Sequence, residues 1–165
     1  MVPLFFCLFL EFFVDLAARR QLIVKACRIL DEDAALLAVT LDEFFFKGNT
    51  DEESIGVNLL PEQRLSLAEY RRILADVRAR NDVQGVFLEL TEIPDPDDEE
   101  DADLWPVACV AFIVTSAPLD EVSEWVEVFH PDDISEGWCV EEGVATPISD
   151  SDLKPGMRPV RVSLL

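Results

Sequence analysis

The sequence VQGVFLELTEIPDPDDEEDADLWPVACVAFIVT, residues 83–115, contains two apolar stretches separated by a run of acids. In the first stretch Val86, Leu88 and Leu90 occupy alternate positions, the period that places side chains on one face of a strand. The second stretch, VACVAFIVT, is a continuous apolar run of strand length. We therefore expect strands at 83–93 and 107–115, joined by an acidic loop, PDPDDEEDAD, at 94–103.

On both sides of these strands the apolar residues recur at helical spacing. Ser66 and Glu69 have the spacing of a capping box, which predicts a helix from residue 67 to about residue 80. Its apolar stripe consists of Leu67, Tyr70, Ile73, Leu74 and Val77. A second helix is expected at 119–129, where His130-Pro131 ends the pattern. Its apolar face consists of Val122, Trp125, Val126 and Phe129.

Two further strands complete the expected fold. SIGVNLL at 54–60 is the first, and the carboxyl-terminal MRPVRVSLL is the last, with Val160, Val162 and Leu164 on alternate positions. The order from residue 54 is strand, helix, strand, strand, helix, strand. This order predicts an α+β fold of the ferredoxin-like, split βαβ type: an antiparallel sheet with both helices on one face.

An amino-terminal helical segment precedes that fold, and the expected division is a hydrophobic segment at 1–35 and one α+β domain at 36–165. Three interpretations of MVPLFFCLFLEFFV, residues 1–14, remain: a helix docked on the core, a membrane anchor, or a stretch that is not natively translated. Glu11 and Asp15 interrupt the apolar run, which makes it shorter than a typical membrane span. Thr40 and Glu43 form another capping box, so a short helix is expected at 41–47, before Gly48.

The charge of the chain is uneven. It has 34 acidic and 13 basic residues, a formal net charge of −21, and the segment 81–153 contains 21 of the acids and neither Lys nor Arg. Phosphate groups are bound by clustered cations, so this distribution argues against nucleic acid as a ligand. It also disfavours adsorption to an anionic membrane. A basic protein partner, divalent cations and plain solubility all fit it.

No catalytic constellation is visible. The only histidine, His130, lies at a helix end, where the helix dipole favours a cation, and no nucleophile motif accompanies it. The glycines form no phosphate-binding pattern, and the four cysteines have no zinc spacing. We predict no catalytic residue and no cofactor, and a reducing, cytoplasmic compartment.

The preferred functional hypothesis is a non-enzymatic module that binds a basic protein through its acidic segment, 92–142. An inhibitor or immunity-type protein that masks a cationic site is its most concrete form. The candidate partner-binding residues are Asp97, Asp98, Glu99, Glu100, Asp101, Asp103, Trp105 and Trp138. If both tryptophans reach the surface, they form an aromatic–acidic patch with these acids. Alternatively, they cover the open face of the sheet, which the amino-terminal helix, the stretch 132–155 or a partner must shield.

The rival hypothesis is a metal-dependent enzyme or a protein that binds divalent cations. Its candidate ligands are Asp51, Glu52, Asp95 and Asp97, with Glu53 beside them. The acidic loop resembles the start of a calcium loop but lacks its central Gly and distal Glu. The alternative for KGNTDEESIGVN, residues 47–58, is a structural turn whose side chains hydrogen-bond to backbone.

Overall fold

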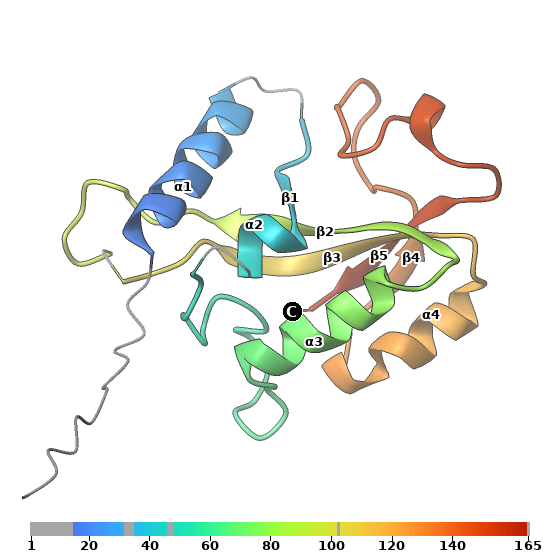
Figure 1. Cartoon of the computed structure of the whole chain (residues 1–165), viewed down its shortest axis with the longest axis horizontal. Coiled ribbons are helices and arrows are strands. Elements are labelled where there is room, and N and C mark those ends of the chain that lie inside the picture. Colours follow the sequence, from blue (N-terminus) through green and yellow to red (C-terminus); the bar gives the residue numbers. More distant parts are fainter. Residues whose placement is uncertain (1–14, 32–34, 46–47, 102, 165) are drawn as a thin grey trace, which may run out of the picture.

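The structure is a computed structural model that describes residues 15–31, 35–45, 48–101 and 103–164 (Figure 1). Its elements in chain order are α1 (Leu16–Asp31), β1 (Ala38–Thr40), α2 (Leu41–Phe45), α3 (Leu67–Arg78), β2 (Val83–Glu92), β3 (Val107–Thr115), α4 (Leu119–Val126), β4 (Ile134–Glu136) and β5 (Arg158–Ser163). One 3₁₀ turn, Glu127–Phe129, prolongs α4, and another lies at Asp150–Asp152. The fold is α+β.

The strands form a five-stranded antiparallel sheet in the order β1-β2-β3-β5-β4. The hairpin of β2 and β3 is its centre, with Val86 opposite Ile113 and Leu88 opposite Ala111. Val86, Leu88 and Leu90 are buried, as their alternation predicts. The expected strands at 83–93 and 107–115 are confirmed to within one residue.

The two predicted helices are confirmed as α3 and as α4 with its 3₁₀ turn, and both lie on the same face of the sheet (Figure 1). Leu74 of α3 and Val126 of α4 belong to one core cluster with Leu88 of the sheet. The predicted capping box at the start of α3 is present. Opposite charges join the helices, since Arg80 Nη2 donates to Glu121 Oε1 at 2.8 Å.

The predicted strand at 54–60 is wrong. Ile55 forms one isolated bridge with Ala108, and the backbone then turns, with the N–H of Leu59 donating to Gly56 O at 3.2 Å. Gly56 has φ +66°, and a Cβ at this position would lie 2.4 Å from the Tyr70 hydroxyl. The apolar residues at 54–60 therefore form a turn that packs on α3. Their composition resembles that of a strand and does not reveal this turn.

The ferredoxin-like arrangement is not confirmed, because it needs a strand from 54–60 beside 107–115. The carboxyl-terminal strand β5 occupies that position instead, antiparallel to β3, with Val162 opposite Ala111. Two three-residue strands that the sequence did not predict, β1 and β4, complete the edges of the sheet. Such short strands carry too few residues for their period to be recognised.

The second face of the sheet is covered by the irregular segment 137–157. Trp138 packs on Phe112 at 5.1 Å between ring centroids, and Ile148, Leu153 and Met157 complete this smaller cluster. The stretch 132–155, one of the three candidates for covering the open face, therefore supplies most of the cover.

The helix α1 packs Leu22 and Ala26 into the same core as α3 and α4. Leu16 and Leu30 at the two ends of this helix are exposed, at 61% and 53%. Within the described ranges no helix is both long and apolar enough to cross a membrane. Residues 1–14, on which the anchor interpretation depends, lie outside the described residues, and the division at residue 35 stays a prediction.

Candidate binding surface at the acidic end of the sheet

The acidic loop projects from one end of the β2–β3 hairpin (Figure 1). Its shape is determined by its own carboxylates: Asp95 Oδ1 accepts from the Asp97 N–H at 2.9 Å, and Asp101 Oδ2 accepts from the Asp95 N–H at 3.0 Å. Asp97, Glu99 and Glu100 are exposed, and their carboxylates accept no hydrogen bond from any described residue. These three charges are therefore free to contact a partner.

A buried arginine anchors the loop from behind. Arg19 of α1 is only 4% exposed. Its Nε donates to Leu104 O and its Nη2 donates to Asp101 O, both at 2.6 Å. The helix α1 thus positions the carboxyl-terminal part of the acidic loop.

The turn at 49–54 supports the loop from the other side. Asn49 is buried and donates from Nδ2 to Ser54 Oγ at 3.0 Å. Asp51 Oδ1 accepts from the Glu53 N–H, and Asp51 Oδ2 accepts from the Trp105 N–H, both at 2.9 Å. The structural interpretation of this turn is confirmed, because its polar side chains bind backbone and one another.

The candidate metal ligands are largely occupied by backbone groups. Glu52 Oε2 accepts from the Leu67 N–H at 2.7 Å, at the start of α3, and Asp51 and Asp95 accept from N–H groups as described. Of the four candidates, Asp97 is the one whose carboxylate accepts no hydrogen bond from the described residues. No group of three acidic, histidine or cysteine side chains in the described part of the chain could hold a metal ion. The metal hypothesis stays a prediction without a site.

A groove of about 450 Å³ is lined by both the turn and the loop. Four carboxylates contribute to it: Asp51 and Glu53 from the turn, Glu92 at the end of β2, and Asp101 in the loop. Glu92 is exposed and accepts no hydrogen bond from the described residues. Glu53 is exposed and lies 3.8 Å from Arg64. The groove is therefore an acidic hollow with two carboxylates accessible to solvent.

Apolar side chains complete the lining, among them Val57, Ile93, Leu104 and Trp105. The sequence analysis did not identify Val57 or Leu104 as site residues. Ile93 and Leu104 directly flank the acidic loop in the sequence, so their place in the lining could be predicted from the sequence. Val57 could not be predicted in this way, because the sequence favours a strand at 54–60 that does not form.

A second acidic surface lies on α4. Asp120, Glu124 and Glu127 are exposed and have no partner among the described residues. The helix begins after the far end of β3, whose nine residues span roughly 30 Å at the usual rise of a strand (Figure 1). The acidic segment 92–142 is continuous in sequence but does not form one surface.

The predicted aromatic–acidic patch does not form, because both tryptophans are buried. Trp105 is 1% exposed and belongs to the core on the helical face of the sheet. Trp138 is 8% exposed and belongs to the cluster on the opposite face, as the alternative interpretation expected. The acids of the loop remain as candidates, whereas the two indoles do not lie side by side at the surface.

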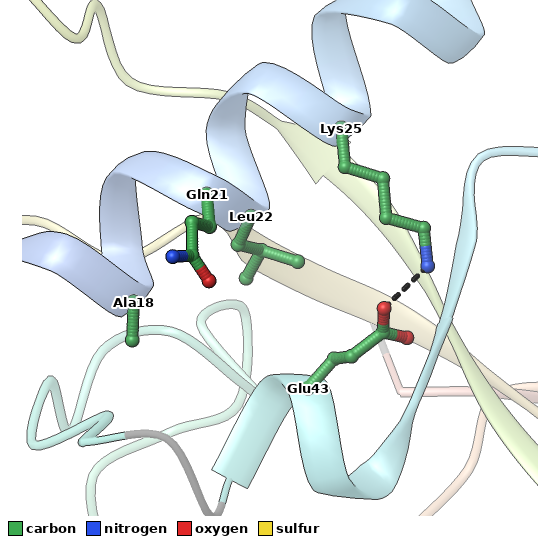
Figure 2. Close-up of a pocket in the computed structure, with 5 residues that line it drawn as sticks. All are labelled: Ala18, Gln21, Leu22, Lys25 and Glu43. Carbon is green, nitrogen blue, oxygen red and sulfur yellow. Dashed lines mark hydrogen bonds and ion pairs between the residues drawn. The ribbon is translucent and has the colours of Figure 1, made fainter.

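A smaller pocket of about 170 Å³ separates α1 from α2 (Figure 2). Lys25 on α1 reaches across it to Glu43 on α2, with 2.5 Å between Nζ and Oε1. Burial opposes ionisation of Glu43, but hydrogen bonds from Lys25 and Thr40 outweigh it and hold its pKa below the ordinary value. Thr40 also exchanges hydrogen bonds with Glu43, as the predicted capping box of α2 requires. The pocket therefore lies at the contact between α1 and α2.

Two remaining sequence candidates have structural positions. His130 is exposed, has φ 50° and donates its N–H to Glu127 O at 3.0 Å, as expected for a residue that ends a helix. Cys109 is buried in the sheet, whereas Cys27 and Cys139 are exposed, and these three thiols are free.

Comparisons with known proteins give a consistent result. The model of the Uncharacterized protein YfbO family matches residues 17–162. A relative from Escherichia coli (strain K12), described as "Uncharacterized protein YfbO", is 36% identical over 126 residues, which are 74% of this chain and 78% of the relative. No solved structure matches the chain. The matched region includes every described helix and strand except the first residue of α1 and the last residue of β5, and the chain belongs to the YfbO family.

Proposed function

We propose that the protein is a non-enzymatic module that binds a basic protein through the acidic end of its sheet. The observation that carries this proposal is the exposed loop 95–103, where the carboxylates of Asp97, Glu99 and Glu100 have no partner among the described residues. A protein that inhibits or masks a cationic site is the most concrete version of this function.

The energetics favour a basic partner. Like charges at close spacing raise the free energy of the unbound surface, and a cationic surface removes this repulsion on binding. Complementary charge also raises the rate of encounter. Because both effects are screened by salt, the complex should weaken as ionic strength increases.

The proposed compartment is the cytoplasm. The basis is the sequence, in which the four cysteines form no paired or zinc-binding spacing, so a reducing environment is expected. Partition of the native protein between soluble and membrane fractions of its own cells, with a thiol-reactive label to count free cysteines, tests this assignment.

Two matched variants test the binding function. The loop variant carries Asp97→Asn, Glu99→Gln and Glu100→Gln, and the helix variant carries Asp120→Asn, Glu124→Gln and Glu127→Gln. Each removes three exposed charges that receive no hydrogen bond from the described residues. The wild type and both variants are used as affinity baits in extracts of the cells that produce the protein.

The proposal predicts a basic partner that the wild type and the helix variant both capture and that the loop variant does not. Capture of the same proteins in equal yield by the loop variant would refute it. Elution of that partner by moderate salt is the second expected result, since exposed charges dominate the contact.

A further inference from the structure

Another groove, which we call the α3 groove, lies between the turn at 48–52 and the start of α3. Its volume is about 600 Å³, and its apolar wall is formed by Phe45, Leu67 and Ala68. Two polar residues of the wall are engaged within the protein. Asn49 donates from Nδ2 to Ser54 Oγ at 3.0 Å, and Glu52 accepts from a backbone N–H at 2.7 Å. The α3 groove is therefore suited to an apolar occupant.

The first described residue, Asp15, lies at the edge of this groove. Its backbone N is 3.0 Å from the position that a Cβ on Gly48 would occupy, and Gly48 lines the groove. Asp15 Oδ1 accepts from the N–H groups of Ala17 and Ala18, at 3.0 and 3.1 Å, and so caps the start of α1. The peptide bond that joins residue 14 to Asp15 is therefore held beside the α3 groove.

The sequence that precedes Asp15 has the chemistry of such an occupant. Residues 1–14, MVPLFFCLFLEFFV, contain five Phe and one charged residue, Glu11. Transfer of apolar surface of this extent from water to a protein surface is strongly favourable. Phe12 and Phe13 are within three residues of Asp15, a span of at most roughly 11 Å of extended chain. Both side chains can therefore reach the α3 groove.

We infer that residues 1–14 dock on the protein, with the side chains of Phe12 and Phe13 in the α3 groove. The two rings pack against Leu67 and Ala68, which removes a large apolar area from water. This contact selects docking from the three interpretations of the amino-terminal stretch. It involves the opposite side of the turn from the acidic groove and does not depend on the basic partner.

The test uses the full-length protein and two pairs of matched variants. The near variant carries Phe12→Ser and Phe13→Ser, and its control carries Phe5→Ser and Phe6→Ser, which remove the same side chains further from Asp15. The groove variant is Ala68→Glu and its control is Ala79→Glu, at two exposed residues of α3 and its carboxyl-terminal cap. Urea denaturation gives the equilibrium constant for unfolding, and backbone amide chemical shifts at 67–71 report on the groove.

We expect the near variant to raise the equilibrium constant for unfolding at least about tenfold, the change that follows when one large apolar side chain loses its burial. Its amide shifts at 67–71 should move, whereas the Phe5→Ser, Phe6→Ser control should change the constant by less than about twofold and leave these shifts in place. Ala68→Glu should add little to the near variant, because docking is already lost, and Ala79→Glu should be additive with it.

Equal effects of the near variant and its control, or unchanged amide shifts at 67–71 in the near variant, would overturn the inference. Full additivity of Ala68→Glu with the near variant would also overturn it. Two other occupants are tested with the same proteins. Binding of the wild type to vesicles of equal parts phosphatidylcholine and phosphatidylglycerol, lost in the near variant without a change at 67–71, would assign Phe12 and Phe13 to a membrane instead. Dimers that Ala68→Glu abolishes would assign the groove to a second copy of the chain.

Discussion

Asp51 connects two segments that are far apart in sequence. One carboxylate oxygen accepts from the Glu53 N–H within the turn, and the other accepts from the Trp105 N–H beyond the acidic loop. This residue therefore joins the turn to the backbone that follows the acidic loop. The Asp51 carboxylate, which made the turn resemble a metal site, instead accepts hydrogen bonds that hold the structure together.

Replacing Asp51 by Asn leaves one of these N–H groups without an acceptor, because the amide nitrogen cannot accept a hydrogen bond. We expect the free energy of unfolding to fall by about 1–3 kcal/mol. Urea denaturation of Asp51→Asn and of the control Asp103→Asn measures it. Asp103 is exposed, so its variant should differ from the wild type by less than about 0.5 kcal/mol. Equal effects of the two variants would contradict this account of the turn.

Gly56 and Tyr70 are a coupled pair at the place where the predicted strand fails. A Cβ at residue 56 would lie 2.4 Å from the Tyr70 hydroxyl, in a backbone conformation with φ +66°. We expect Gly56→Ala to lower the free energy of unfolding by about 1–3 kcal/mol. Tyr70→Phe removes the clashing oxygen, so the double variant should lose less than the sum of the single losses. Additive losses in urea denaturation would show that the steric contact is not the cause.

At the scale of elements, α1 is the support of the acidic loop. It contributes Leu22 and Ala26 to the core, and Arg19 reaches from it to two loop carbonyls. It is also joined to α2 through Lys25 and Glu43. The helix α1 therefore connects the contact with α2 that Figure 2 shows to the candidate binding surface at the acidic loop.

Removing the Arg19 guanidinium should loosen the loop. We expect Arg19→Met to reduce the free energy of unfolding by about 1.5–3 kcal/mol, because two hydrogen bonds from a charged donor are lost. Hydrogen exchange of the amides at 101–105 should become faster. Arg28→Met, which changes an exposed residue of the same helix away from the loop, is the control and should alter neither quantity. Unchanged exchange in Arg19→Met would show that α1 does not support the loop.

The Lys25–Glu43 contact makes a pH-dependent contribution with a definite sign. The folded state holds the pKa of Glu43 below its ordinary value, so the stabilisation is present above the unfolded pKa and is lost as pH falls through the folded pKa. At pH 7 we expect Glu43→Gln to lower the free energy of unfolding by about 0.5–1.5 kcal/mol relative to the wild type. This difference should shrink in acid. A difference that grows as pH falls would reverse the assignment.

In the whole molecule, the exposed acidic residues of the segment 92–142 gather at two places, near opposite ends of the sheet. The loop 95–103 lies at one end of β3, and α4 begins after the other end (Figure 1). Three of the basic residues outside the acidic segment pair with acids inside it, through Arg80, Arg158 and Arg161. What distinguishes the loop end from α4 is the groove next to it, since both carry exposed, unpaired carboxylates.

The sequence predicts the regular elements that have many periodic positions and misses features that depend on packing. Val86, Leu88 and Leu90 identify β2 because three alternating positions agree, and the Ser66–Glu69 box marks the start of α3. The apolar run at 54–60 misleads because Gly56 turns the chain under Tyr70. The burial of Trp105 and Trp138 on opposite faces of the sheet depends on contacts between distant segments, which composition does not encode.

The most direct test of the account is the affinity of the captured partner for the wild type, the loop variant and the helix variant, measured side by side at low and at moderate salt. We predict that the loop variant binds at least about tenfold more weakly than the wild type at low salt, whereas the helix variant keeps most of the affinity. The difference in affinity between the wild type and the loop variant should become smaller as the salt concentration increases. Equal losses in the two variants, or an affinity independent of salt, would contradict a binding surface at the acidic end of the sheet.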